Sequence, residues 1–265
     1  MNLADAKLVF LDVETTGLSP AIGDRIIEVG LISCAGDREV ARVSHLVNPE
    51  RDIPLAARRV HGIRDQDVAA CAPFGAIAGE VASALDGQWV VGHNIRFDAG
   101  FIAMELACAG VPARPAGCLD TRYLAAAVWD LPNYRLDTVA EHVGAGGAGS
   151  HRALADAERT RAVFHRVIAE LGGWIRVRID ELLALHTHVP CWPDDGRRNL
   201  PAAIYDALTN GSEVAVDYVN GLGTASRRSI RPLACFAAGK TVYLRAHCQL
   251  AGEVRTFRLD RIVVG

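Results

Sequence analysis

Apolar and polar residues follow two different spacings along the first 171 positions. Short, mostly apolar runs that end at turn signals cover residues 8–13, 25–34 and 40–47. Such runs are typical of strands, and three in succession with short connections predict an antiparallel meander. Apolar residues then recur every three to four positions over 74–85, 97–109, 121–129, 136–143 and 152–171, with one more strand-like run at 89–92. This order predicts an α/β domain with a mixed sheet and flanking helices.

The pattern changes near residue 172. Residues 172–197 contain glycine, proline and aspartate turn signals around one short helical stretch, which is typical of a linker. A helix over 200–208 then precedes strand-like runs at 213–219, 229–236, 241–247 and 254–259. We therefore expect a first domain over 1–171, a linker over 172–197 and a small strand-rich domain over 198–265.

Composition narrows the class of protein. With 50% apolar and 22% charged residues, the chain has the composition of a globular protein. It has no run of about 18 apolar residues and no signal pattern at its start, so we expect no membrane partner and a cytoplasmic location. Seven cysteines without a C-x-x-C pair agree with reduced thiols.

The net charge of −3 is unevenly distributed. Residues 1–170 carry a formal charge of −6, whereas residues 198–265 carry +4. An average near zero therefore does not exclude a nucleic-acid partner, because the second domain alone is basic.

Two carboxylates lie close together at the end of the first predicted strand. Asp12 and Glu14 are two residues apart, so the pleat places both side chains on one face. Paired carboxylates raise each other's pKa unless a cation neutralises them, and oxygen ligands favour Mg²⁺ or Mn²⁺. On its own, this pair is more often a solvated strand end flanking a turn than a metal site.

Two further segments add acidic residues and a histidine. Asp98 follows the strand at 89–92 and lies near the start of a helix, a junction where open α/β sheets bind ligands. His151 and Asp156 are five residues apart and diverge by about 140° on an ideal helix. They can converge only if His151 lies in the loop before the helix, and the glycine-rich run at 144–149 supplies that freedom.

These segments together resemble a known family. In order and content they are similar to the three motifs of DEDDh-type 3′–5′ exonucleases: D-x-E-T-T-G at 12–17, H-N-x-x-F-D at 93–98 and H-x4-D at 151–156. This branch includes the epsilon proofreading subunit of bacterial DNA polymerase III. The resemblance covers residues 6–171 and implies a ribonuclease H-like fold. It also implies two Mg²⁺ or Mn²⁺ ions as cofactors.

The family pattern implies a role for each matching residue. Asp12, Glu14, Asp98 and Asp156 would hold the metal ions, and His151 would act as the general base. The terminal nucleotide and its neighbours would be contacted by Thr15, Thr16, Gly17, His61, His93 and Asn94.

The second domain resembles the WYL domain of bacterial regulators. The matching segments include Arg231-Pro232-Leu233, Val242-Tyr243-Leu244 and the end F-R-L-D-R-I, with Val242 in place of the tryptophan that names the family. The resemblance implies a small SH3/Sm-like β domain that binds nucleic acid or a nucleotide-like ligand. Arginine side chains can bind phosphate groups, and tyrosine rings can stack on bases. On this ground the candidate contacts of the second domain are Tyr218, Arg228, Arg231, Arg245 and Arg258. Arg258 and Asp260 share a face and could equally form a structural ion pair.

The sequence therefore predicts an enzyme, a metal-dependent 3′–5′ exonuclease that releases 5′-mononucleotides from DNA. We expect DNA rather than RNA as its nucleic-acid partner, and DNA repair or processing as its setting. A polymerase or repair protein remains a possible partner, although the linker contains no glutamine-led clamp-binding peptide. Two alternatives stay open: an RNA-trimming exoribonuclease, and a sensor or defence nuclease regulated by its WYL domain.

Overall fold

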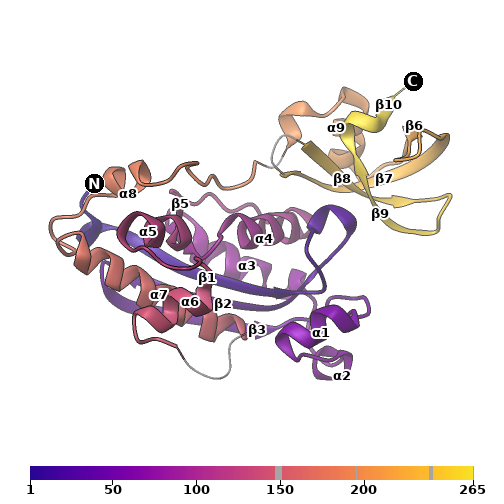
Figure 1. Ribbon diagram of the computed structural model, residues 1–265. Coiled ribbons are helices and arrows are strands. Elements are labelled where there is room, and N and C mark those ends of the chain that lie inside the picture. Colours follow the sequence, from indigo (N-terminus) through magenta and orange to yellow (C-terminus); the bar gives the residue numbers. More distant parts are fainter. Residues whose placement is uncertain (147–150, 195, 239–240, 265) are drawn as a thin grey trace.

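The computed structural model describes residues 1–146, 151–194, 196–238 and 241–264, which form two domains (Figure 1). The first domain is built around a five-stranded sheet in the order β3-β2-β1-β4-β5. Its strands are β1 (Lys7–Thr15), β2 (Ile26–Ala35), β3 (Arg38–Leu46), β4 (Trp89–Gly92) and β5 (Gly117–Asp120). β1, β2 and β3 are antiparallel neighbours, whereas β4 runs parallel to β1 and β5 parallel to β4. The predicted mixed sheet with a meander is confirmed, and β5 is an additional strand.

Helices cover both faces of this sheet. One face packs on α3 (Phe74–Leu85) and α4 (Arg96–Ala109), and the other on α5 (Thr121–Val128), α6 (Leu136–His142) and α7 (Ala153–Glu170). Alternate residues of β1 point to the two sides, so Val9 and Leu11 contact the first layer while Phe10 packs against Phe164 of α7. This three-layer arrangement follows from a central strand that is apolar on both faces. Among the described helices, none has both the length and the apolar character needed to cross a membrane.

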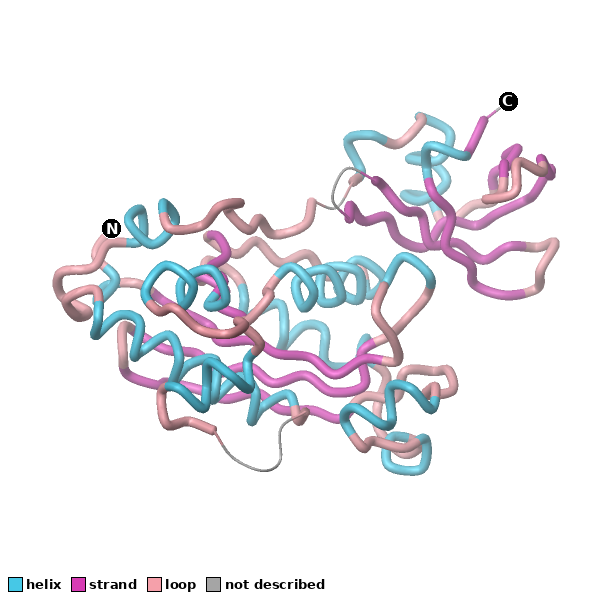
Figure 2. Tube along the Cα trace, in the orientation of Figure 1, coloured by secondary structure: helices cyan, strands magenta, loops and turns pink. Residues whose placement is uncertain are grey.

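A small helical excursion follows β3. It contains α1 (Leu55–His61) and α2 (Asp65–Val68), which the apolar spacing did not indicate. Ile53, Ile63 and Val68 bury their side chains with Ile27 of β2 in a separate small cluster. The segment with α1 and α2 therefore packs against one end of the β1–β3 meander through a small apolar core of its own (Figure 2).

The segment after α7 packs on the first domain before it reaches the second. Val177, Ile179 and Leu182 are buried in the same core as α7, and α8 spans Ile179–Ala184. Asn2 and Arg178 form an antiparallel bridge, so this segment lies beside the beginning of the chain. Beyond α8 the chain runs without regular structure over α5 and α4 toward the second domain (Figure 1).

The second domain contains one helix and a second five-stranded sheet, all antiparallel, in the order β10-β6-β7-β8-β9. Its elements are α9 (Ala202–Asn210), β6 (Val214–Val219), β7 (Ala225–Ala238), β8 (Thr241–Cys248), β9 (Glu253–Arg258) and β10 (Ile262–Val264). Ile204 of α9 packs with Val216, Ile230, Leu244 and Phe257 in a core separate from that of the first domain. The predicted strand-rich domain is confirmed, with β10 as an additional strand.

The two domains meet mainly at α4, and the short turn Pro20–Ile22 of the first domain also contacts β9. β7 contacts α4, and Arg245 Nη1 of β8 lies 3.5 Å from Met104 Sδ of α4. Phe236 is almost fully buried and stacks on Tyr243 at 5.6 Å between ring centroids. The helix that carries Asp98 is therefore also the helix on which the second domain sits.

Candidate active site

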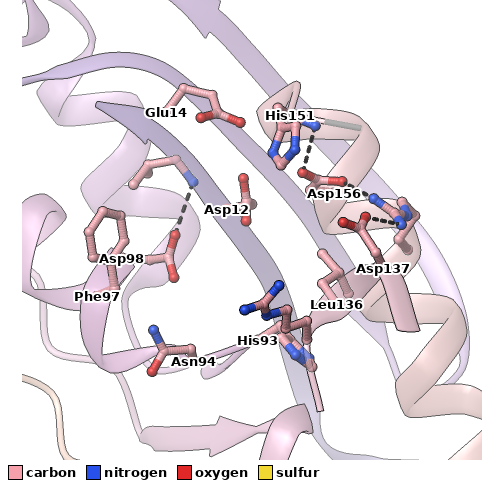
Figure 3. A pocket seen from close by; sticks show the side chains of 13 residues that line it. Asp12, Glu14, His93, Asn94, Phe97, Asp98, Leu136, Asp137, His151 and Asp156 are labelled. Carbon is pink, nitrogen blue, oxygen red and sulfur yellow. Dashed lines mark hydrogen bonds and ion pairs between the residues drawn. The ribbon is translucent and has the colours of Figure 1, made fainter. Parts of the chain in front are cut away.

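The candidate site lies at one edge of the first sheet. Because β1 and β4 are parallel, their carboxyl ends meet at this edge, and α4 starts directly after β4. A pocket of about 300 Å³ opens here. Its lining includes the five predicted catalytic residues, Asp12, Glu14, Asp98, His151 and Asp156 (Figure 3). Three segments far apart in the sequence thus contribute to one pocket.

Asp98 connects the start of α4 to the end of β1. Its Oδ1 accepts a hydrogen bond of 3.1 Å from the backbone N–H of Val13, the residue between Asp12 and Glu14. Asp98 is only 3% exposed, so this bond holds a buried carboxylate in a fixed position. The pleat of β1 then turns Asp12 and Glu14 toward the opposite, α7 side of the sheet, as their spacing predicts.

His151 converges with Asp156 because it precedes the helix. α7 begins at Ala153, Asp156 lies in its first turn, and His151 has a left-handed φ of +69°. The backbone N–H of His151 donates to Asp156 Oδ2 at 3.0 Å. Residues 147–150 of the preceding glycine-rich run lie outside the described residues. A non-glycine residue in this conformation is strained, and such strain is found often at functional sites.

Glu28 and Gly30 of β2 position the start of α7. The buried Glu28 carboxylate accepts from the Arg152 guanidinium at 2.7 Å and from the backbone N–H of Ala153 at 3.0 Å. It therefore caps the helix from a neighbouring strand. A Cβ at Gly30 would lie 2.4 Å from the backbone nitrogen of Leu154, so only glycine lets α7 approach this closely.

The carboxylates raise one another's pKa. Burial, and then the charge of Asp98, raises the pKa of Asp12 well above its ordinary value, with Glu14 and Asp156 adding to the effect. Burial, and then Asp156 and Glu28, raises the pKa of Glu14 to about 8, although Arg152 opposes this shift. Burial raises the pKa of Asp98 as well, against the hydrogen bond from Val13. The acids therefore crowd a volume in which their charges are poorly compensated by the protein.

This donor set suits divalent cations. One ligand atom each of Glu14, His151 and Asp156 lies within 4.8 Å of the other two. Crowded carboxylate oxygens with raised pKa values are stabilised by a hard cation, and Mg²⁺ and Mn²⁺ are the ions that such ligands favour. The residues present therefore fit the metal ions that the sequence implies.

The predicted substrate residues on the loop after β1 have different surroundings. Thr15 Oγ1 donates to the carbonyl of Gly17 at 2.6 Å, and Thr16 Oγ1 accepts from the backbone of Arg25 at 3.0 Å. Asp24 accepts from Thr16 and from the backbone of Ser19. These hydroxyl groups fold the loop beside the pocket, and their contact with a nucleotide stays a prediction.

His61 brings an unpaired donor to the same region. Its Nδ1 accepts from the backbone N–H of Ile63 at 3.0 Å, and its buried Nε2, which lies near the backbone of Thr15, has no partner with full hydrogen-bond geometry among the described residues. Burial lowers the pKa of His61, against the opposing effects of Glu28 and the Thr15 backbone, and the nearby His151 adds to the lowering. A neutral ring therefore keeps its proton on Nε2, where a bound group could accept it.

His93 and Asn94 line the pocket in different ways. Both ring nitrogens of His93 are used, by Thr121 Oγ1 and by the carbonyl of Tyr134, each at 2.9 Å. Asn94 has a left-handed φ of +65°, its backbone N–H donates to Asp120, and its side chain borders the pocket (Figure 3). Asn94 thus has the freer side chain for a ligand.

Sequence reasoning missed Arg159 and its partner. Arg159 Nη1 lies 2.9 Å from Asp156 Oδ1, and its Nη2 lies 2.6 Å from Asp137 Oδ1. Arg159 and Asp137 both line the pocket, and the Arg159 guanidinium offsets part of the negative charge of Asp156. The three-residue spacing of Asp156 and Arg159 on a helix was the available signal.

The five residues predicted for the second domain do not form one surface. The Arg228 guanidinium lies 5.9 Å above the Tyr218 ring, and Tyr218 packs edge-on against Phe257 in the core. Strand alternation places Arg245 on the opposite face, at the contact with α4.

Arg231 and Arg258 also differ in their settings. Arg231 is exposed on β7, opposite His247. Arg258 forms the ion pair with Asp260 at 2.6 Å that their spacing allows. The structure therefore brings Tyr218 and Arg228 together and separates them from Arg245.

Comparison with known protein families assigns both domains. A family model described as Exonuclease matches residues 9–164, and one described as WYL domain matches residues 200–264. The 3′-5′ exonuclease DinG of Bacillus subtilis (strain 168) is 37% identical over 166 residues, which are 62% of this chain and 18% of that protein. DNA polymerase III subunit epsilon of Rickettsia conorii is 31% identical over 178 residues, 64% of this chain and 76% of that protein.

Solved structures share the fold. A complex of E. coli ExoI with single-stranded DNA superposes with a TM-score of 0.58 at 18% identity, over 91% of this chain and 54% of that chain. Exonuclease X in complex with 5′ overhanging duplex DNA superposes with a TM-score of 0.52 at 22% identity, over 68% of this chain and 98% of that chain. The Exonuclease match over residues 9–164 and the WYL match over residues 200–264 show that the chain belongs to the Exonuclease family, as a DEDDh-type domain followed by a WYL domain.

Proposed function

We propose that this protein is a metal-dependent 3′–5′ exonuclease that hydrolyses the terminal phosphodiester bond of single-stranded or frayed DNA and releases 5′-mononucleotides. The observation that carries the proposal is the meeting of Asp12, Glu14, Asp98, Asp156 and His151 in one pocket. A purely binding role would not require carboxylates whose pKa values are raised by burial and by one another.

The carboxylates would hold two divalent cations. Asp12 lies centrally, with Glu14 and Asp156 on one side of it and Asp98 on the other (Figure 3). Asp12 would help to hold both ions, with Glu14 and Asp156 as further ligands on one side and Asp98 on the other. Two such ions supply charge stabilisation at the attacking and leaving oxygens of an in-line displacement.

His151 would take the proton of the attacking water. This ring lines the pocket beside Glu14 and Asp156, and histidine is a common general base in enzymes. The water oxygen forms a bond to phosphorus as the bond from phosphorus to the 3′-oxygen breaks, and the water proton passes to the imidazole. The released 3′-oxygen takes a proton from solvent. Asp156 holds the His151 backbone and so keeps the ring at the pocket.

We further propose DNA as the substrate and DNA repair or processing as the setting. The relatives include a polymerase subunit, and the two superposed structures described above are complexes with DNA. Another structure with this fold is a 3′-exonuclease that recognises a histone mRNA stem-loop, so the test below includes RNA. The basic second domain would attract the substrate and raise its local concentration.

Degradation of matched oligonucleotides tests the proposal. DNA and RNA strands of one sequence, labelled at the 3′ or the 5′ end, are incubated with the full chain in Mg²⁺, Mn²⁺ or EDTA. We expect immediate release of the 3′ label as a mononucleotide, gradual shortening of 5′-labelled DNA, and no reaction in EDTA. Full activity in EDTA or in Asp98→Ala would overturn the mechanism, and faster loss of RNA would favour the exoribonuclease alternative.

A further inference from the structure

A second, larger cavity adjoins the catalytic pocket. It has a volume of about 820 Å³ against about 300 Å³ for the catalytic pocket, and Asn94 and Phe97 line both. Its floor is the first two turns of α4, and one wall is the loop after β1 with Leu18 and Pro20. The other wall is the connecting segment 188–194, which links the two domains. The two cavities therefore lie side by side and share part of their lining, and we call the larger one the groove.

The connecting segment is held in place at both ends. His186 accepts from the backbone N–H of Asp120 at 2.9 Å, which fixes the segment where it leaves α8. At the far end the backbone N–H of Ala237 in β7 donates to the carbonyl of Asp194 at 3.0 Å. Between them Trp192 packs against the core on the α4 face of the sheet. This segment is a fixed wall of the groove, although the sequence pattern indicates a linker.

The groove presents aromatic rings and a cation to its occupant. Tyr123, Phe97 and Trp192 are partly exposed and line it, and the exposed side chain of Arg96 stands in the first turn of α4. Stacking surfaces beside an arginine are the means by which proteins hold single-stranded nucleic acid without reading its sequence. An oligonucleotide whose 3′ end occupies the catalytic pocket continues beyond its terminal nucleotide, and the shared residues Asn94 and Phe97 mark a route from that pocket into the groove.

We propose that this groove binds the nucleotides that precede the 3′-terminal one, with Trp192 and Tyr123 as stacking surfaces and Arg96 as a phosphate contact. The inference depends on the proposed exonuclease function and specifies how a longer strand is held. The connecting segment would then distinguish long substrates from short ones. A mononucleotide ester occupies the catalytic pocket alone, whereas a longer strand also contacts this segment. We expect the rate to increase with oligonucleotide length until the groove is filled.

The test compares a short and a long substrate in the full chain. Trp192→Ala should lower kcat/KM for an oligonucleotide of about ten nucleotides by about 5- to 100-fold, the loss that corresponds to one stacked base. It should leave hydrolysis of the p-nitrophenyl ester of thymidine 5′-monophosphate unchanged, and Trp192→Phe should restore most of the rate. Tyr205→Ala, which removes an exposed aromatic ring on α9 outside the groove, is the matched control and should change neither rate.

The outcomes separate the two proposals. If the wild-type chain hydrolyses neither substrate, the exonuclease function fails. If it hydrolyses both and Trp192→Ala keeps the full rate on the long strand, the groove assignment is overturned.

A second measurement does not depend on turnover. The Asp98→Ala chain is photo-crosslinked to oligonucleotides with 5-iodouracil at the second or third position from the 3′ end, and the modified residue is identified by mass spectrometry. Crosslinks to Trp192 or Tyr123 support the groove. Crosslinks confined to the second domain or to the His61 side of the pocket overturn it, even where Trp192→Ala fails to fold.

Discussion

The backbone N–H of His151 donates a 3.0 Å hydrogen bond to the Asp156 carboxylate across the residue at which α7 begins. This bond joins the proposed general base to a proposed metal ligand. It also keeps His151 in its left-handed conformation, at the end of a glycine-rich segment.

Replacement of His151 tests its role as the base. We expect His151→Ala to lower kcat by about 10²- to 10⁴-fold, the usual contribution of a positioned acid or base. The pH dependence of the remaining activity should lose the step near neutral pH, while the metal-induced rise in Tm persists. A pH profile of kcat for both proteins is the measurement, and an unchanged profile in the variant would remove His151 from this role.

Asp12→Asn separates catalysis from stability. The substitution removes a charge that the neighbouring carboxylates and burial disfavour, so the metal-free protein should become more stable. We expect a rise in Tm of a few degrees, since about 1 kcal/mol corresponds to about 2–4 °C in a protein of this size. Nuclease activity should be lost, and Mg²⁺ should no longer raise Tm as it does in the wild type. A less stable metal-free variant would contradict the proposed crowding of charge.

Stability of the metal-free protein should fall as pH rises. Glu14 has a pKa of about 8 in the folded chain against an ordinary value of 4.5, so the folded state binds its proton more tightly than the unfolded state does. The free energy of unfolding therefore declines between about pH 4.5 and 8, by up to about 5 kcal/mol from this group. Urea titrations across this range measure the slope, and Glu14→Gln should reduce it.

Divalent metal should reverse this trend. Because metal binds the deprotonated carboxylates, the rise in Tm on adding Mg²⁺ should be larger at pH 8 than at pH 6. Thermal melts in Mg²⁺ and in EDTA at both pH values give this difference. Equal shifts at the two pH values would show that metal binding is not coupled to these protons.

Gly30→Ala should damage the site from a distance. The added Cβ would lie 2.4 Å from Leu154 N, so the first turn of α7 must move and carry Asp156 with it. We expect a loss of about 1–3 kcal/mol in the free energy of unfolding and about a 100-fold loss of activity. Gly79→Ala is the control, because its Cβ would meet no atom within 4 Å on α3 and should stabilise the helix by about 0.5–1 kcal/mol. Equal behaviour of the two variants would show that α7 tolerates displacement.

Local pattern was enough to predict much of the site. The pleat alone places Asp12 and Glu14 together, and the end of β4 places Asp98 at the start of a helix. The convergence of His151 and Asp156 follows once His151 lies outside the helix, a condition that could be stated from spacing alone. β5 and β10, with four and three residues, are too short to show a period.

Contacts between distant segments could not be predicted. Glu28 and Arg152 are 124 residues apart, and no local pattern links a strand carboxylate to a helix start that far away. Arg245 of the second domain contacts Met104 of the first. Neither the basic charge of the second domain nor the apolar spacing of α4 in the first indicates this contact. The division of Tyr218 and Arg228 from Arg245 follows from strand register, which composition does not contain.

The bridge between Asn2 and Arg178 bears on how the catalytic domain can be isolated. The backbone N–H of Ile179 donates to the carbonyl of Met1, and Val177 accepts from Leu3, so the segment after α7 completes the fold around the first residues. A fragment cut directly after α7 would lack Val177, Ile179 and Leu182. The apolar side chains that pack against these three residues would then be exposed to water, and the fragment would be prone to aggregation. A fragment that extends through His186 keeps these contacts with the first residues. We therefore expect residues 1–186 to be expressed in folded form without the second domain.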